Sequence, residues 1–194
     1  MCKLWLGLDI YKGGNCRICD NTMSPGAKHG LACKSGGDLI KRHNRIRDFI
    51  YNLSREAGLN PSLEKGNLLG EQPGRRPADV FIENFREGAS AALDVAVTCP
   101  FRGTFKNDIH AVEKYSKDIK IHKYAGDFNQ NIKYIPIVMD TFGGLNEDGE
   151  SAIKSIIERN VETKGRYSKG TLWRRLFHTL FTENVKMILK RLPG

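Results

Sequence analysis

The sequence lacks any apolar run close to the roughly 20 residues that span a bilayer, so no membrane-spanning helix and no membrane partner are expected. Its first seven residues also lack the apolar segment and the small-residue cleavage site of a secretory signal peptide. Internal repeats and low-complexity tracts are missing as well. We therefore expect a globular protein that is not secreted.

Cysteine is scarce, and its count of five is odd. An odd count without a signal peptide argues against a disulfide framework. The spacing instead indicates a metal site, because Cys16-x2-Cys19 is followed, after nine residues, by His29-x3-Cys33. Two close pairs of such ligands are typical of tetrahedral zinc. The four residues therefore predict a structural Zn²⁺ site.

The segment around these ligands, residues 11–37, is too poor in large apolar residues to form a core alone. A bound metal would supply the order that its composition cannot. The alternative is three unrelated buried thiols and a surface histidine. Cys99 lies outside the pattern, and we interpret it as a core thiol at the end of a buried strand.

Positive charge is concentrated in the two flanks of the chain, whose net charge is +9. Residues 1–37 carry five basic against two acidic residues, and residues 148–194 carry ten against five, whereas residues 38–147 carry sixteen against fifteen. This distribution suits an acidic polymer held by the flanks, although a solvated basic surface explains it equally well. We divide the chain accordingly into a zinc knuckle segment (1–37), a core (38–147) and a basic helical extension (148–194).

The apolar periodicity predicts helices alternating with strands. The expected helices cover residues 38–57, 107–124, 150–161 and 172–192, and the expected strands cover residues 78–82, 91–99 and 134–139, with a short strand and a long loop in residues 62–77. Asp38 is expected to cap the first helix, and Gly58 to end it. The polar linker 83–88 predicts a hairpin between the first two strands. This order indicates a mixed α/β fold with one sheet flanked by helices.

Two predicted strands each carry one aspartate in an apolar setting, Asp79 and Asp94. A buried acid is costly unless it is paired or bound to a metal. On neighbouring strands the two carboxylates could hold Mg²⁺, which prefers oxygen ligands and can activate water for phosphodiester hydrolysis. The alternatives are an ion pair of Asp79 with Arg75 or Arg76, and a salt-bridged core role for Asp94.

A lysine is expected near the acids, where it would stabilise charge on a phosphate. In the PD-(D/E)XK nuclease pattern it follows the second acid by two residues, but that position is Ala96 here. The next predicted helix offers Lys120 and Lys123. Counted at 100° per residue, Lys123 lies beside the apolar edge and Lys120 lies nearer to solvent, so Lys123 is favoured, with an exposed helix face as the alternative for both.

Basic residues that could contact nucleic acid interleave with aromatic ones near the C-terminus. The candidates there are Lys164, Arg166, Lys169, Arg174 and Arg175, and Arg75 and Arg76 before the first predicted strand are two more. Tyr167 or Trp173 could stack on a base, although for Trp173 we favour docking of the last helix. His43 falls in the apolar arc of the first helix, which favours a core histidine over a role near the scissile phosphate.

A series of short motifs, taken in order, resembles the C-terminal part of non-LTR retrotransposon proteins that carry a restriction-like endonuclease. The motifs are Leu4–Gly7, the Cys16, Cys19, His29 and Cys33 set, Arg42-His43-Asn44, Arg76–Val80, Ala92–Val97, Lys120-x2-Lys123-Tyr124, Ile135–Val138 and Phe142–Gly144. The resemblance covers about residues 4–145. It also extends to stand-alone fragments derived from such elements.

The resemblance implies a restriction-endonuclease-like mixed sheet with an N-terminal zinc knuckle and C-terminal helices. It implies a nuclear protein, cytoplasmic before import, that nicks duplex DNA with Mg²⁺ or Mn²⁺, with the RNA of the parent element as a second candidate partner. Asp79 and Asp94 match the two metal-binding acids. Lys120 or Lys123 matches the catalytic lysine, which in this family lies on the helix after the strand.

The chain also departs from the family pattern. Ala78 is inserted between Pro77 and Asp79, and no reverse transcriptase segment is present. An alternative is therefore a catalytically inactive, zinc-containing DNA-binding remnant. A third reading is a small zinc-stabilised interaction protein with no nucleic-acid role.

Overall fold

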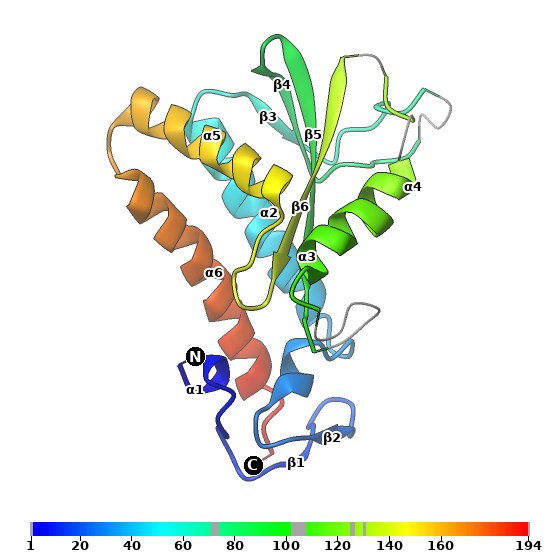
Figure 1. Cartoon of the computed structure of the whole chain (residues 1–194), viewed down its shortest axis with the longest axis vertical. Helices are drawn as coiled ribbons and strands as arrows, with labels where there is room; N and C mark the ends of the chain where they lie inside the picture. Colours follow the sequence, from blue (N-terminus) through cyan, green and yellow to red (C-terminus); the bar gives the residue numbers. More distant parts are fainter. Residues whose placement is uncertain (1, 71–73, 102–107, 125–126, 130, 194) are drawn as a thin grey trace.

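The centre of the molecule is a four-stranded mixed sheet with helices on both faces, seen in a computed structural model (Figure 1). The structure describes residues 2–70, 74–101, 108–124, 127–129 and 131–193. The strands are β3 (Pro61–Leu63), β4 (Val80–Arg86), β5 (Ala89–Thr98) and β6 (Ile132–Asp140), in that spatial order. The pairs β3–β4 and β4–β5 are antiparallel, and β5–β6 is parallel. The predicted mixed α/β class is confirmed.

The hairpin between β4 and β5 is tighter than the sequence indicated. Strand β4 continues to Arg86, and only Glu87 and Gly88, both with positive φ, form the turn. The prediction of a linker over residues 83–88 is therefore wrong at its start. The polar residues there are strand positions beside an irregularity in the register between Ile82 and Arg86.

Three long helices occupy the predicted positions: α2 (Asp38–Glu56), α5 (Glu147–Lys164) and α6 (Lys169–Leu189). Helix α2 ends just before Gly58, whose φ of 72° suits glycine, as predicted. Asp38 does not cap α2, because Gly37 occupies the cap position. The Asp38 carboxylate instead accepts hydrogen bonds from Lys190 and pairs with Arg191, after the end of α6.

The stretch between β5 and β6 is helical, as expected, but only from residue 111; residues 108–110, which the prediction included, form a turn, and most of the segment is not α-helix. It comprises α3 (Ala111–Lys114), a π-helix that we call η2 (Tyr115–Ile121) and α4 (His122–Tyr124); residue 107 of the predicted helix lies outside the described residues. Ile119 and His122, predicted on the apolar side, are exposed. A π-helix closes i→i+5 hydrogen bonds and so turns less per residue, which shifts every position counted at 100°.

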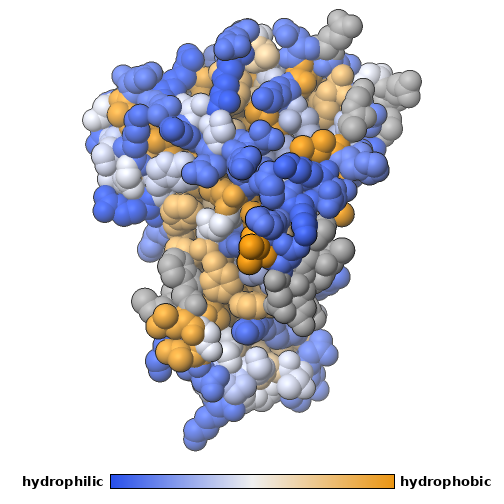
Figure 2. All heavy atoms as spheres, in the orientation of Figure 1, coloured by the Kyte–Doolittle hydropathy of each residue, from blue (hydrophilic) through white to orange (hydrophobic). Residues whose placement is uncertain are grey.

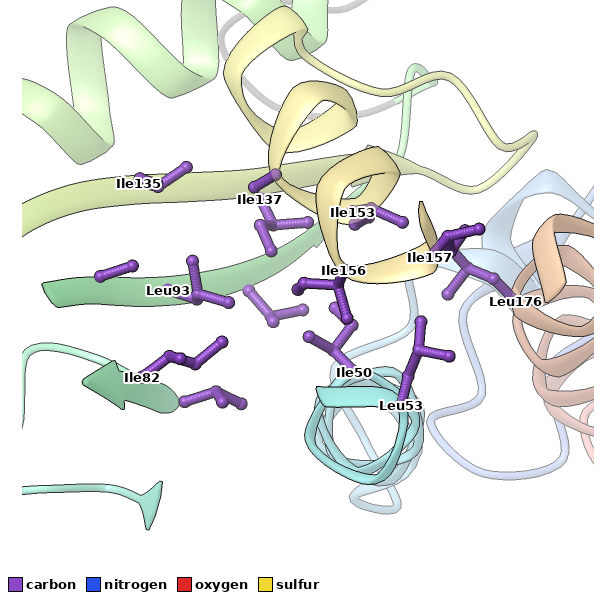
Figure 3. Packing of buried hydrophobic residues seen from close by; sticks show 14 of the residues in the cluster. Ile50, Leu53, Ile82, Leu93, Ile135, Ile137, Ile153, Ile156, Ile157 and Leu176 are labelled. Carbon is purple, nitrogen blue, oxygen red and sulfur yellow. The ribbon is translucent and has the colours of Figure 1, made fainter. Parts of the chain in front are cut away.

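The main core lies on one face of the sheet, beneath α2, α5 and α6 (Figure 3). In this cluster Leu93 and Ile137 from the strands meet Ile50 of α2, Ile156 of α5 and Leu176 of α6. The helices of the predicted C-terminal extension, residues 148–194, therefore pack into the main core. Their apolar residues recur at helical spacing on faces that complete the core of the sheet.

The N-terminal segment forms a small lobe against the far end of α6. It contains α1 (Cys2–Trp5), the strand pair β1 (Gly14–Asn15) and β2 (Thr22–Met23), and a 3₁₀ turn, η1 (Lys28–Leu31). Met23 and Leu31 pack with Ile188 of α6 in a second apolar cluster. Figure 2 shows apolar residues exposed across the narrow waist between this lobe and the sheet. None of the described helices is long and apolar enough to cross a membrane.

Candidate metal centre and acid–lysine site

The four predicted zinc ligands come together in the N-terminal lobe. The ligand atoms of Cys16, Cys19, His29 and Cys33 all lie within 4.8 Å of one another. Cys19 Sγ is 3.2 Å from His29 Nε2, and Cys33 Sγ is 3.6 Å from Cys19 Sγ. Two sulfurs in a tetrahedral zinc site stand about 3.8 Å apart when each Zn–S bond is about 2.3 Å. The cluster can therefore bind a metal such as zinc.

The thiols of this cluster interact strongly with each other and with Arg191. Burial raises the pKa of Cys33, but its hydrogen bond with Arg191 contributes to a net lowering. For Cys19, a backbone hydrogen bond from Asn21 lowers the pKa, and burial together with the neighbouring thiols raises it further than that. Three thiolates cannot share this space without a cation, so a metal would relieve their repulsion.

The two predicted acids face each other across β4 and β5. Val80 pairs with Leu93, so Asp79 stands directly opposite Asp94, and Asp79 N donates to Leu93 O at 2.9 Å. The Asp79 carboxylate accepts a hydrogen bond from Val95 N at 2.7 Å and lies 3.0 Å from His43 Nε2 of α2. His43 is therefore a half-buried partner of an acid and not the core histidine that the sequence favoured.

The Asp94 carboxylate is bonded to side chains of η2 and β6. Lys120 Nζ of η2 lies 2.9 and 2.8 Å from its two oxygens, and the Tyr134 hydroxyl of β6 donates to Oδ2 at 2.6 Å. Side chains alternate between the faces of a strand, and Leu93 and Val95 enter the main core. Asp94 therefore lies on the opposite face, which η2 covers.

The environments of the two acids move their pKa values apart. Burial raises the pKa of Asp79, but His43, Val95 N–H and the charge of Lys120 together lower it more. The pKa of Asp94 is raised, because burial and the charge of Asp79 outweigh Lys120 and Tyr134. Pairs of carboxyl groups shifted in opposite directions are typical of active sites, although structural ion-pair networks can produce the same shifts.

The structure brings Lys120, and not Lys123, to the acids. Lys123 is exposed, with Nζ 4.9 Å from the centre of the Tyr124 ring. The prediction that Lys123 lies nearer to the acids than Lys120 is wrong. It counted 100° per residue, as in an α-helix, whereas η2 is a π-helix. Sequence reasoning also missed Tyr134, which reaches Asp94 through the parallel pairing of β5 with β6, and this pairing left no signal in the sequence.

The predicted nucleic-acid contacts fall into two separate groups. Arg75 lies 5.7 Å from the Tyr124 ring, and Arg76 pairs with Glu64. The second group surrounds the α5–α6 turn, on the opposite side of the molecule from α4 (Figure 1). It contains exposed Lys164, Lys169 paired with Glu158, Arg174 bonded to Thr171, and Arg166 and Arg175 at 5.3 and 5.0 Å from the Tyr167 ring.

Trp173 belongs to the core-facing side of this second group. Its ring stacks on Phe177 at 5.8 Å and packs against the main core, as the docking interpretation predicts. Tyr167 also packs against the core and is flanked by two arginines. Both rings are half-buried against neighbouring side chains, and their stacking on a base stays a prediction.

Comparison with known proteins adds no family to these observations. No protein-family model matches the chain, and no curated protein matches it either. The resemblance to retrotransposon endonucleases therefore stays a prediction from the motifs.

Proposed function

We propose that the protein is a metal-dependent DNA endonuclease of retrotransposon origin with a restriction-endonuclease-like fold, acting in the nucleus. The observation that carries the proposal is the placement of Asp79 opposite Asp94 at one end of the β4–β5 pair, with Lys120 bonded to Asp94. Two carboxylates beside an amine are the groups that phosphodiester hydrolysis with a hard cation needs.

Asp79 and Asp94 would hold Mg²⁺ or Mn²⁺ through carboxylate oxygens, with water completing the coordination. Each carboxylate has about four lone-pair positions, so its bonds to protein donors leave room for a cation. When bound, such a cation supplies an activated water and neutralises charge on the phosphate. Lys120 would donate to the oxygen on which charge develops, while His43 and Tyr134 hold the two carboxylates in place.

Duplex DNA is the proposed substrate, because the chain carries a net charge of +9 and exposed arginines on two sides. The Cys16, Cys19, His29 and Cys33 cluster would hold a structural Zn²⁺ that orders the N-terminal lobe. RNA of the parent element is a second candidate partner.

The test is nicking of a supercoiled plasmid with Mg²⁺ or Mn²⁺, and with EDTA. We expect metal-dependent open circles, and we expect Asp94→Asn and Asp79→Asn each to lower the rate at least about 100-fold while DNA binding persists. The matched control is Asp118→Asn, an exposed acid on η2, which should nick at the normal rate. Nicking that survives both substitutions would exclude this site.

A second candidate is the inactive DNA-binding remnant, favoured by one observation. Both carboxylates are already bonded to protein donors, Asp79 to His43 and Val95 N, and Asp94 to Lys120 and Tyr134. Such a satisfied network is also what a purely structural pair requires. This candidate predicts salt-sensitive DNA binding with no nicked product under any divalent metal.

A further inference from the structure

A groove of about 650 Å³ runs from the Cys/His cluster to the edge of η2. Its walls include Cys33 and Lys34 of the N-terminal lobe, Arg42 of α2, Thr98 at the end of β5, and Tyr115 and Ile119 of η2. We call it the Arg42 groove. Its residues Arg42 and Ile119 directly precede His43 and Lys120 in the sequence, so the groove and the acid–lysine site share the helices α2 and η2.

Arg42 is an unusual wall residue, because its side chain is only 1% exposed. Its Nη1 donates to Leu31 O at 3.1 Å and to Asn184 Oδ1 at 2.8 Å, and both acceptors are neutral. Among the residues that the structure describes, no carboxylate pairs with Arg42, and its Nε has no hydrogen-bond partner. A buried charge without a counter-charge is costly, so this position favours an anion.

The charge of Arg42 persists at neutral pH. Burial lowers the pKa of Arg42 to about 10; the nearby Cys99 thiol opposes this shift and Arg191 adds to it, and the guanidinium stays protonated. Exposed Lys34 adds a second cation to the same groove. With Zn²⁺ bound, the cluster of three thiolates and one imidazole would carry a charge of about −1, and the positive charge of Arg191 beside Cys33 would offset it.

We propose that the Arg42 groove binds a short stretch of single-stranded nucleic acid, with phosphates near Lys34 and Arg42 and bases against Tyr115 and Ile119. This inference rests on the proposed function, for which it names the path of one strand next to the acids. The volume lies within the range of pockets that hold one drug-sized molecule, which is enough for part of a single strand and too small to enclose a duplex. Basic groups beside an aromatic platform are what single-strand sites use.

The test is binding of a short fluorescein-labelled oligodeoxythymidylate, measured by anisotropy in EDTA-free buffer without added divalent metal, so that no cleavage is needed. We expect Lys34→Glu and Ile119→Glu each to weaken binding about tenfold. Both side chains are exposed, so neither substitution should disturb folding. Arg42 itself is left intact because its removal would leave Leu31 O and Asn184 without their donor.

The matched controls are Lys133→Glu, at the start of β6, and Leu63→Glu, on the edge strand β3. They make the same two changes outside the groove, at the N-terminal end of β6 and on the edge strand of the sheet. Leu63 is also as exposed as Ile119, at 41% against 43%. We expect each control to bind within about twofold of the unmodified protein. Equal weakening by the groove and control variants would mean diffuse charge attraction and would overturn the proposal.

Competition experiments show whether the groove prefers a nucleic acid to other anions. Displacement of the oligonucleotide by inorganic phosphate, or by polyglutamate at equal charge concentration and ionic strength, would overturn a nucleic-acid site. Retention against both supports it. If the protein does not nick plasmid but the groove variants bind the oligonucleotide less tightly, the proposed endonuclease is refuted and the groove proposal is supported. If the protein nicks normally and the groove variants bind the oligonucleotide as tightly as the unmodified protein, the groove proposal is refuted and the endonuclease is supported.

Discussion

The Cys/His cluster and the acid–lysine site differ in how the chain builds them. The cluster draws its four ligands from residues 16–33, within one small lobe. The acid–lysine site draws His43, Asp79, Asp94, Lys120 and Tyr134 from α2, the residue before β4, and then β5, η2 and β6. The first site can be recognised from spacing, whereas the second exists only once the sheet has formed.

The two sites also differ in how many protein hydrogen-bond donors their side chains already have. The thiols of the cluster chiefly face one another and a histidine, so a metal could bind there without displacing many protein donors. Both carboxylates of the acid–lysine site have protein donors, so a cation there must compete with them. We therefore expect tight metal binding at the cluster and weaker binding at the acids.

The largest effect is expected at the cluster. Cys33→Ser should abolish tight metal binding and unfold the N-terminal lobe, because a structural zinc supplies on the order of 10 kcal/mol in small modules. The measurements are metal content by mass spectrometry and thermal unfolding. Cys99→Ser, a cysteine outside the ligand set, is the control and should keep its metal. Full metal content in Cys33→Ser would contradict the assignment.

The next effect is expected at the lysine that the structure selects. Lys120→Ala should lower the plasmid-nicking rate about 100-fold, the usual size of losing a positioned donor to developing charge. Lys123→Ala removes the same charge three residues away from an exposed position and should change the rate less than about threefold. A larger loss of nicking in Lys123→Ala than in Lys120→Ala would show that Lys123 is the lysine near the acids, as α-helical rotation of 100° per residue predicts, and would contradict the π-helical geometry of η2.

A smaller effect is expected where α2 meets the end of α6. Asp38→Asn should lower the free energy of unfolding by about 3 kcal/mol, because it leaves fully buried Arg191 without its acid. Burial raises the pKa of Asp38, but Lys190 and Arg191 lower it below its usual value. This contribution is therefore present at neutral pH and is lost as pH falls below about 4.

Denaturant unfolding at neutral and acidic pH measures this contribution. The unmodified protein should lose more stability than Asp38→Asn as pH falls. Asp48→Asn, on the same helix, breaks the more exposed pair with Arg47 and should cost less than about 1 kcal/mol. If Asp38→Asn and Asp48→Asn lower the free energy of unfolding equally, the buried Asp38–Arg191 pair stabilises the protein no more than the exposed pair does.

The smallest effect is expected at Tyr134. Tyr134→Phe removes one hydrogen bond to Asp94 and keeps the ring packing, so nicking should slow about tenfold, the equivalent of about 1.4 kcal/mol. Tyr124→Phe, in the same cluster of rings, is the control and should nick normally. An unchanged rate in Tyr134→Phe would show that Lys120 alone suffices to hold Asp94.

Sequence reasoning predicted the helices and strands that carry strong periodicity. The helix from Asp38, its end at Gly58 and the hairpin of β4 with β5 all follow from local patterns. It also predicted which two acids would meet, because both lie in apolar strands joined by a short linker. It was wrong about the position of Lys123, and it did not show that the apolar faces of the C-terminal helices pack into the core of the sheet, since helix rotation and core packing are not local properties.

By itself, the sequence determined the α/β class and the four ligands of the Cys/His cluster, because short-range spacing and periodicity act within one turn or one hairpin. Only the tertiary structure decided that His43, Lys120 and Tyr134 reach the acids, and that Arg42 is buried in a groove wall. These contacts join residues from separate helices and strands, and their positions depend on the register of β5 with β6 and on the π-helical turn of η2.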